Sequence, residues 1–293
     1  SYFVWNASTN DRLCKEIKQY NPDCKIIYGG LGTPKYGRCQ KFMNDRPYVD
    51  AIVHNEGEIV FANLLKNDDW STVNGITTHK FITPLESRIK NFAELPSPYL
   101  NGLFDELVDK SDNPYEWESL VEPSRGCPYK CTFCDVPIKT HRRRSPEKVV
   151  DEMFDCQKKG YDEIHFYDDL FNITPQRLTD ICDEIDKRQL KITWDFRGRV
   201  NGVNQESLRR FKKSGGRMIS FGIETASTEG LKVLRKGSTV KQNIDALKWC
   251  REFGIVSVAD YMIGLPFEKT DTDVIESLNV LRKKYRPDYA QFG

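Results

Sequence analysis

Short apolar runs alternate with amphipathic segments along two stretches of this chain. Near the N-terminus, the runs YFVW (2–5) and KIIYGG (25–30) predict strands. The segment VDAIVHNEGEIVFANLL (49–65) predicts a further strand followed by a helix. The segment DRLCKEIKQY (11–20) has the apolar spacing of a helix that covers one face of a sheet. This βαβαβα order predicts an open, mostly parallel sheet.

A second and longer alternation runs from residue 119 to the end of the chain. Its strands are predicted at SLVEPS (119–124), EIHFYD (163–168), KITWDF (191–196), RMISFGIE (217–224), VSVADYMIG (256–264) and DYAQF (288–292). Helical patterns lie between these runs, and the first helix has Ser145 as N-cap and Pro146 at its first position. Repeated strand–helix units favour a (β/α)6 partial TIM barrel, in which active-site loops follow the carboxyl ends of the strands.

We therefore predict an α/β protein of two parts. Residues 1–68 form the open-sheet part and residues 119–293 form the partial barrel. The linker, residues 69–118, contains the helix- and strand-breaking segments LPSPYLNG and KSDNPYEW. The chain begins without methionine in a β-rich run and stops within its sixth barrel strand, so we expect both ends to be cut from a longer protein.

Composition argues against several classes of function. The 44 Lys and Arg residues nearly balance 43 Asp and Glu residues, so no overall field attracts nucleic acid or an anionic membrane. No apolar run reaches the roughly 18–20 residues of a membrane span. Nine unevenly spaced cysteines are not typical of a disulfide framework, which predicts a cytoplasmic location. Cys156, Cys182 and Cys250 fall in helical patterns, where we expect buried thiols.

Three cysteines lie close together in the segment EPSRGCPYKCTFCDVP (122–137). Cys127, Cys131 and Cys134 have the spacing C-x3-C-x2-C, in the loop after the first predicted barrel strand. Three thiolates can hold three corners of a cubane iron–sulfur cluster and leave the fourth iron open to another ligand. They can also bind zinc together with a histidine, although His141 does not have the spacing of a zinc finger.

This loop and its setting resemble those of the radical S-adenosylmethionine (SAM) superfamily, over residues 119–293. The resemblance implies that Cys127, Cys131 and Cys134 ligate a [4Fe–4S] cluster, whose open iron binds the amino and carboxylate groups of SAM. One electron from the cluster then cleaves SAM to methionine and a 5′-deoxyadenosyl radical. The resemblance also implies that Phe133 contacts the adenine.

Later motifs resemble the same family by position. FYDD ends the second strand, which implies that Asp168 and Asp169 hold the methionine end of SAM; the alternative is that they cap the next helix. Arg197 and Arg199 follow the third strand and are candidates for the SAM carboxylate, with surface ion pairs as the alternative. Glu224 ends the fourth strand and resembles the acid that hydrogen-bonds the ribose hydroxyls.

Two further stretches concern the adenine and the substrate. MIGLPFE resembles the family's G-L-P-G-E, which implies that Ile263 and Gly264 offer backbone atoms to the adenine. Phe267 replaces the usual glycine, so the turn geometry and any role of Glu268 stay open. The basic run HRRR (141–144) is expected to be a solvated loop, with contact to an anionic substrate as the alternative.

The N-terminal part resembles the latter half of the Rossmann-like cobalamin-binding domain that precedes many radical SAM barrels. This implies that Ser1, Gly29 and Gly30 lie around the nucleotide tail of cobalamin; without the resemblance, the glycine pair indicates a tight turn. The cobalt-ligating D-x-H-x-x-G motif is expected upstream of residue 1. The nearest string here is IVHNEG, with Ile52 at the aspartate position, so we expect His54 to be structural.

These features together predict a cobalamin-dependent radical SAM methyltransferase. Its substrate would be an unidentified small molecule or peptide with an unactivated carbon or phosphorus centre, and its electron donor a flavodoxin or ferredoxin. The close alternative is a radical SAM enzyme that performs a rearrangement, cyclisation or oxidation and whose cobalamin domain is vestigial. From a different class, the chain could be a non-catalytic binding protein stapled by zinc at Cys127, Cys131 and Cys134. In that case the FYDD, GIETAS and GLP stretches would have no reason to recur at strand ends.

Overall fold

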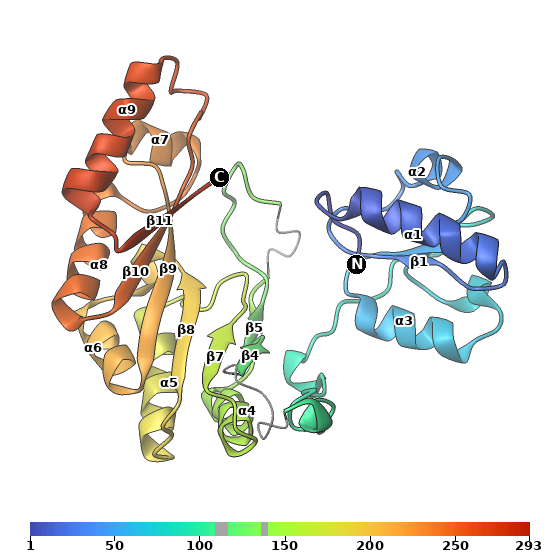
Figure 1. The fold of residues 1–293 in the computed structure, drawn as a ribbon, viewed down its shortest axis with the longest axis horizontal. Helices are drawn as coiled ribbons and strands as arrows, with labels where there is room; N and C mark the ends of the chain where they lie inside the picture. The colour runs from blue at the N-terminus through green and yellow to red at the C-terminus, as the bar shows by residue number, and fades with distance from the viewer. Residues whose placement is uncertain (109–116, 136–139) are drawn as a thin grey trace. The chain divides into compact units, whose positions relative to one another are not determined.

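The computed structural model describes residues 1–108, 117–135 and 140–293, which Figure 1 shows as a ribbon. They divide into two compact units, Ser1–Lys90 and Asn91–Gly293. No described helix is long and apolar enough to cross a membrane. The division falls inside the predicted linker, and the predicted boundaries at 68 and 118 stay predictions.

The first unit is a three-stranded sheet with helices. Its elements are α1 (Ala7–Tyr20), β1 (Ile27–Tyr28), α2 (Gln40–Asn44), β2 (Ala51–Val53), α3 (Gly57–Lys66), a 3-10 turn (Trp70–Thr72) and β3 (Ile76–Thr78). The strand order is β1-β2-β3, with β1 parallel and β3 antiparallel to β2. The helix and strand predictions at 11–20, 25–30 and 49–65 are confirmed. Pairing of β3 with β2 places residues 76–78 in this unit.

The strand predicted at residues 2–5 is wrong. The Tyr2 N–H donates to the Gly29 carbonyl over 2.6 Å, and the Gly32 N–H donates to the Tyr2 carbonyl over 3.0 Å. This pairing ends at the next residue, because the Phe3 N–H donates to the Asn6 side chain over 2.8 Å and the chain turns into α1. A local side-chain hydrogen bond thus replaces the continuation of the strand.

The second unit contains the remaining elements. They are 3-10 turns at Phe92–Glu94 and Asp105–Leu107, β4 (Glu118–Val121), β5 (Ser124–Arg125), β6 (Arg142–Arg143), α4 (Pro146–Lys158), β7 (Glu163–Phe166), α5 (Pro175–Lys187), β8 (Thr193–Gly198), a 3-10 turn at Val200–Gly202, α6 (Gln205–Lys213), β9 (Gly216–Glu224), α7 (Thr228–Val233), α8 (Val240–Phe253), β10 (Val256–Tyr261), α9 (Asp271–Val280), a π-helical turn at Leu281–Tyr285 and β11 (Tyr289–Phe292).

Six of these strands form one parallel sheet in the order β11-β10-β9-β8-β7-β4. This order follows the sequence, so the carboxyl ends of consecutive strands lie along one edge, as expected for repeated strand–helix units. Five of the predicted strands are confirmed with small changes at their ends, while the run at 119–124 is divided between β4 and β5. Ser145 caps α4 and Pro146 opens it, as the sequence predicts.

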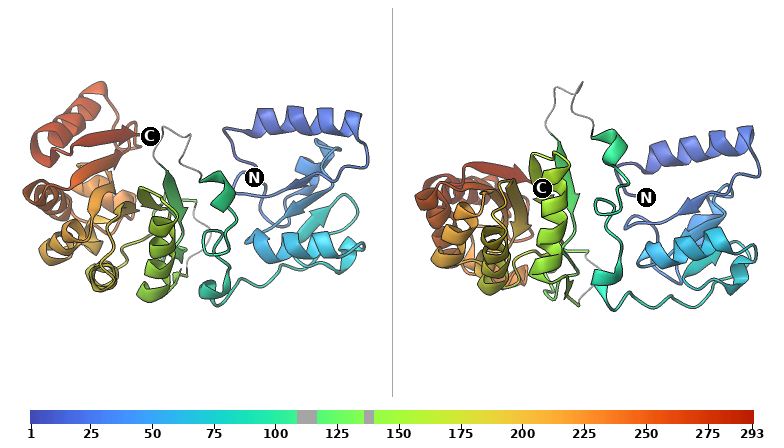
Figure 2. Two further views of the ribbon diagram at one scale, coloured as in Figure 1. Left: turned by 60° about the horizontal axis from the view of Figure 1, so that its bottom comes forward. Right: turned by 90° about the horizontal axis from the view of Figure 1, so that it is seen from below.

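Side chains on this sheet alternate between an apolar and a polar face. The helices α4, α5, α6 and α8 lie along one face (Figures 1 and 2). Rings and aliphatic groups under them are fully buried, among them Ile164, Phe166, Trp194, Phe196, Ile219 and Phe221. The opposite face carries polar side chains at alternate positions, such as His165, Asp195 and Arg197. The strands therefore supply both the hydrophobic core and a polar surface.

The three helical cysteines belong to this core. Cys156, Cys182 and Cys250 are all free thiols with no exposed surface. Burial raises the pKa of each thiol to about 12. The prediction that they are buried structural thiols is confirmed.

Candidate functional site

The loop that carries the three cysteines begins directly after β5. Cys127, Cys131 and Cys134 are partly exposed free thiols. The Cys134 N–H donates to the Cys131 carbonyl over 3.3 Å, and the Thr132 N–H donates to the Leu234 carbonyl over 3.0 Å. The loop is therefore held both by its own turn and by the segment after α7.

Asp168 and Asp169 lie under this loop and do not cap a helix. The next helix, α5, is capped by Thr174, so the helix-capping alternative is wrong. The Ser124 hydroxyl donates to Asp168, whose pKa lies well above its usual range because the carboxyl is buried. Asp169 accepts the Gly126 N–H over 2.8 Å. Both acids thus fix the backbone that leads into Cys127.

Arg199 lies against the cysteine loop. Its guanidinium carbon is 3.7 Å from the centre of the Tyr129 ring, and its Nη1 is 3.6 Å from the Cys131 sulfur. Nε donates to the Asn201 side chain over 3.3 Å. The residue is only 6% exposed, and Nη2 is buried without a hydrogen-bond partner in the described ranges. The surface ion-pair alternative is therefore wrong for Arg199.

Arg197, two residues earlier, points onto the polar face of the sheet. Its Nη2 donates to Asp260 and Gln291, each over 3.1 Å, and its side chain is 46% exposed. For Arg197 the ion-pair alternative is therefore confirmed. The structure separates two residues that the sequence analysis grouped together, because alternation along β8 and the turn after it send them to different surroundings.

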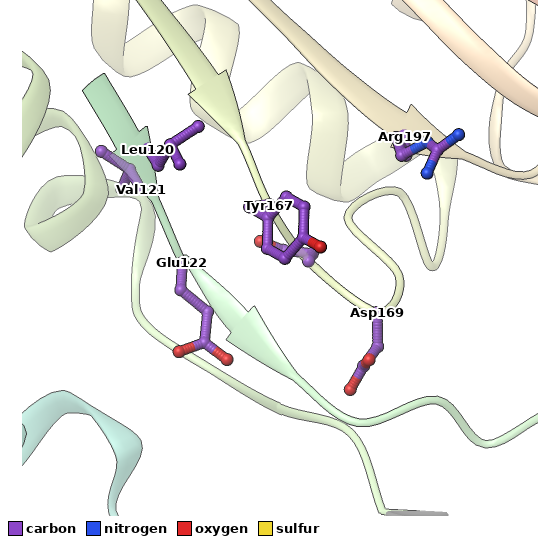
Figure 3. Close-up of a pocket in the computed structure, with 7 residues that line it drawn as sticks. Leu120, Val121, Glu122, Tyr167, Asp169 and Arg197 are labelled. Carbon is purple, nitrogen blue, oxygen red and sulfur yellow. The ribbon is translucent and has the colours of Figure 1, made fainter. Parts of the chain in front are cut away.

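Arg197 also lines a pocket of about 480 Å³ at the carboxyl ends of β4 and β7. Its other lining residues are Leu120, Val121, Glu122, Tyr167, Asp168 and Asp169. Figure 3 shows Glu122 and Asp169 on either side below the Tyr167 ring, with Arg197 above Asp169. An exposed ring, a cation and carboxylates at one edge are suited to a ligand with apolar and charged groups.

Glu224 ends β9 in a left-handed conformation, with φ of 64°. Its carboxylate pairs with the Lys236 Nζ over 2.6 Å, and both residues are more than nine-tenths buried. Lys236 also lies 5.8 Å from the centre of the Phe133 ring. Lys236 was not predicted from the sequence, because the pattern around it is that of an ordinary basic turn. One carboxylate oxygen of Glu224, the residue predicted to bind the ribose, is thus already paired with Lys236.

Near the end of β10, Phe267 is compatible with a tight turn. Gly264 has φ of 72°, and the N–H of the following residue donates to Glu268 over 3.1 Å. The ring of Phe267 packs on Gly230, where an added Cβ would lie 2.4 Å from the ring. Glu268 therefore closes the turn, which answers the question that the sequence left open. Ile263 is half-exposed beside it.

The basic run at 141–144 is not a solvated loop. Two of its residues form β6, which pairs antiparallel with β5. Arg144 forms an ion pair of 2.6 Å with the buried Glu152. His141 Nε2 lies 2.9 Å from the Leu170 carbonyl, and burial lowers the pKa of the ring. His141 is therefore engaged away from the cysteines, which weakens the zinc alternative.

The three thiols fit a [4Fe–4S] cluster by their chemistry. Burial raises the pKa of Cys127, the negative charges of Cys131 and Cys134 raise it further, and the Arg199 guanidinium opposes this. Within the described ranges, no three His, Cys, Asp or Glu side chains are grouped so that they could hold one metal ion between them. Each thiolate of a cubane ligates its own iron, so convergence on one point is not required.

In the first unit, Ser1, Gly29 and Gly30 meet at one turn. Gly30 has φ of 106°, and an added Cβ would lie 3.1 Å from the Tyr2 carbonyl oxygen and 3.4 Å from the Ser1 Cβ. The tight-turn alternative is thus confirmed, and the role in cobalamin binding stays a prediction. His54 is buried with Nε2 2.8 Å from the Thr77 hydroxyl, so its structural role is confirmed.

A polar cluster that was not predicted from the sequence crosses β7, β8 and β9. His165 Nδ1 contacts the Asp195 carboxylate, which raises the pKa of the imidazole. Arg217 pairs with Asp195 over 3.3 Å and also contacts Glu163. Burial raises the pKa of Glu163 to about 7. Only the register of three parallel strands brings these residues together, since each is isolated in the sequence.

The family model described as "Radical SAM superfamily" matches residues 121–281. An uncharacterized methyltransferase, PH0819, of Pyrococcus horikoshii is 31% identical over 304 residues, which cover 99% of this chain and 63% of that protein. The anaerobic magnesium-protoporphyrin IX monomethyl ester cyclase of Rubrivivax gelatinosus is 29% identical over 315 residues, 99% of this chain and 54% of the cyclase. The cobalamin-dependent radical SAM methyltransferase TokK of Streptomyces tokunonensis is 30% identical over 191 residues, 61% of this chain and 28% of TokK.

Solved structures share the fold over nearly the whole chain. The cobalamin-dependent S-adenosylmethionine radical enzyme OxsB, with aqua-cobalamin and S-adenosylmethionine bound, has a TM-score of 0.75 at 24% identity, covering 94% of this chain and 42% of OxsB. The radical S-adenosylmethionine methyltransferase TsrM from Kitasatospora setae, with cobalamin and a [4Fe–4S] cluster bound, has a TM-score of 0.74 at 18% identity, covering 98% of this chain and 58% of TsrM. At these identities the likeness shows the fold alone.

Proposed function

This chain belongs to the radical SAM superfamily, and from that membership we propose that it is part of a cobalamin-dependent methyltransferase. The observation that carries the proposal is the loop of three thiols beside a buried cation at the carboxyl edge of a parallel sheet. The named methyltransferases among its relatives support the reaction class. The chain spans 63% of the Pyrococcus horikoshii methyltransferase and 54% of the Rubrivivax gelatinosus cyclase. What we say of the activity of the whole protein is therefore part of this proposal.

Cys127, Cys131 and Cys134 would hold the cluster. When bound there, a [4Fe–4S] cluster supplies the electron for reductive cleavage of SAM. Asp169 and Asp168 keep the start of the loop in place, through the Gly126 N–H and the Ser124 hydroxyl. Their role in this proposal is to position the loop, in addition to any contact with SAM.

The SAM site would extend along the same edge. We assign the adenine to Phe133, Ile263 and Gly264, whose ring or backbone is accessible near the cysteines and β10. We assign the ribose to Glu224, and Lys236 pairs with one carboxylate oxygen of Glu224. The remaining assignments, to the methionine end of SAM, are Asp168 and Asp169.

Cobalamin would lie at the glycine turn of the first unit. The turn presents backbone without side chains at Gly29 and Gly30, beside Ser1, which suits close approach of a large ligand. The fold likeness to OxsB and TsrM supports a Rossmann-like unit before a (β/α)6 partial barrel. A small-molecule or peptide substrate and a flavodoxin or ferredoxin as electron donor complete the proposal.

A second candidate is cyclisation without methyl transfer. A cyclase of Rubrivivax gelatinosus is similar over 99% of this chain, as extensively as the uncharacterized methyltransferase. The cysteine loop and SAM residues would serve both reactions equally. The two candidates differ in whether S-adenosylhomocysteine is formed and whether cobalamin is required.

The test is an assay of both SAM products under anaerobic conditions. The protein is reconstituted with iron and sulfide, reduced with dithionite and given SAM, with and without methylcobalamin. Formation of 5′-deoxyadenosine together with S-adenosylhomocysteine, dependent on cobalamin, supports methyl transfer. Deoxyadenosine alone, indifferent to cobalamin, supports the second candidate. A cluster-loaded protein that yields neither product contradicts both.

A further inference from the structure

Arg199 is a buried cation whose contacts are not those of a structural arginine. It is 6% exposed and makes no ion pair with a carboxylate among the residues that the structure describes. Its side-chain contacts are the Cys131 sulfur, the Tyr129 ring and the Asn201 amide oxygen. None of these groups carries a negative charge while the cysteine is a thiol.

Such an arrangement is costly unless an anion is added. A buried charge loses its hydration, and neutral partners restore only part of the loss. Nη2 is a buried donor with no acceptor in the described ranges. The buried Lys236 near the site, in contrast, is paired with the Glu224 carboxylate. Arg199 therefore lacks the kind of counter-charge that Lys236 has.

The backbone around Arg199 holds the guanidinium at this place. Its N–H donates to the Asn172 Oδ1 over 2.9 Å, and its carbonyl accepts from the Asn172 Nδ2 over 2.8 Å. Asn172 is 1% exposed, so this double contact is shielded from water. Gly202 packs on the same residue, where an added Cβ would lie 1.9 Å from the Asn172 carbonyl oxygen. The cation is held by the fold and does not simply rest against the loop.

We propose that Arg199 is the resident counter-charge of the iron–sulfur cluster, donating Nη1–H to the Cys131 sulfur and making the reduced cluster easier to form. This inference rests on the proposed function, since it requires a [4Fe–4S] cluster on Cys127, Cys131 and Cys134. Arg199 acts through the cluster and is a positioning residue, which distinguishes it from the exposed Arg197.

The physical reason lies in the charge of the cluster. A cubane on three thiolates is anionic, and reduction adds one more negative charge. A fixed cation at a ligating sulfur stabilises the reduced state more than the oxidised state, and hydrogen bonds to the sulfurs act in the same direction. A sulfur ligated to iron is also a better acceptor than a thiol, because it carries negative charge.

The experiment compares midpoint potentials of the reconstituted protein and three variants, by EPR-monitored redox titration without SAM. R199Q removes the charge, and we expect the equilibrium constant for reduction of its cluster to fall about tenfold. For a one-electron couple this lowers the midpoint potential by about 59 mV. R199K keeps the charge and should shift less than half as far. R197Q is the matched control, with the same charge change at an exposed arginine bonded to Asp260 and Gln291, and its potential should be unchanged.

Three results would overturn the inference: a potential of R199Q equal to that of the wild type, an equal fall in R199K, or an equal fall in R197Q. If R199Q binds no cluster, the melting of the apo proteins decides. If apo R199Q has the same melting temperature as the apo wild type, the result supports a role toward the cluster. If its melting temperature is far lower, the role of Arg199 is to stabilise the fold, and the inference is overturned. Failure of the wild type itself to take up iron and sulfide would instead contradict the proposed function.

Discussion

The two compact units differ in how they present chemistry. In the second unit, side chains that can ligate, donate and carry charge gather at the carboxyl ends of parallel strands. In the first unit, the candidate site is a turn made of backbone, where Gly29 and Gly30 lie against Ser1 and Tyr2. Reactive side chains reveal their chemistry by type and spacing, whereas a bare backbone turn reveals only that something can approach it.

Their hydrophobic cores differ in the same sense. One continuous cluster with a row of buried rings on β7–β9 fills the second unit. The first unit has two small clusters, and none of the residues of α1 is fully buried. A large core holds buried polar groups in fixed positions, so the second unit can maintain an ion pair or an unpaired cation that a small core cannot.

The largest expected effect separates the units by cluster content. Cys131→Ala removes one of the three proposed thiolate ligands, and we expect bound iron and sulfide, with SAM cleavage, to fall to background. Cys24→Ala changes a partly exposed cysteine of the first unit and should leave all of them unchanged. Iron and sulfide analysis after anaerobic reconstitution measures both variants. Equal cluster content in the two variants would contradict the assignment of the ligands.

The next effect compares ion pairs of different burial. Lys236→Met leaves the Glu224 carboxylate buried without its partner, which should cost about 3–5 kcal/mol of unfolding free energy. Lys18→Met breaks a 2.9 Å pair in the first unit whose side chains are about one-fifth exposed, and should cost about 0.2–1 kcal/mol.

Hydrogen exchange of β9 and of α1 reports the two costs separately. Adding Glu224→Gln to Lys236→Met should recover much of the loss, because the uncompensated charge is removed. If the double variant is less stable than the single one by a similar amount again, the cost comes from packing and the charge argument is wrong.

A smaller effect tests the glycine turn. Gly30→Ala forces a non-glycine residue to φ of 106° and brings its Cβ to 3.1 Å from the Tyr2 carbonyl oxygen, which should cost about 1–3 kcal/mol and weaken cobalamin retention. Gly37→Ala is the matched control, because φ is 79° there but an added Cβ meets nothing within 4 Å. Cobalamin bound per chain measures the difference. An equal loss of bound cobalamin in both variants would mean that backbone strain, and not contact at the glycine turn, is responsible.

A last effect is a pH dependence of opposite sign in the two units. Burial lowers the pKa of His54, so its contribution to stability is present above the ordinary value of 6.5 and is lost as the pH falls. Burial raises the pKa of Glu163 from 4.5 to about 7, so its contribution is present below pH 4.5 and is lost as the pH rises to 7. The raised pKa of His165 acts in the same direction as that of Glu163.

Hydrogen exchange resolved by unit, between pH 4.5 and 7, detects these contributions. His54→Gln should flatten the dependence in β2 and Glu163→Gln the dependence in β7, each without effect on the other unit. Unchanged slopes in both variants would show that other groups set the pH dependence.

The local pattern of residues in the sequence determined the strands of the parallel sheet and the position of the cysteine loop. The alternation of apolar runs and amphipathic segments predicted six parallel strands, because period and burial are properties of neighbouring residues. The spacing of Cys127, Cys131 and Cys134 within one loop pointed to a cluster for the same reason. The sequence failed at residues 2–5, where an apolar run predicted a strand and the Asn6 side chain turned the chain away.

The tertiary structure decided which partner each polar residue has. Arg199 reaches Cys131 across 68 positions, Asp169 reaches Gly126 across 43, and Lys236 meets Glu224 only because the chain folds back after α7. Partners across a sheet depend on the register of its strands, and a shift of one residue sends a side chain to the opposite face. The sequence thus predicted the cysteines as the cluster ligands, and only the fold determined which charges surround them.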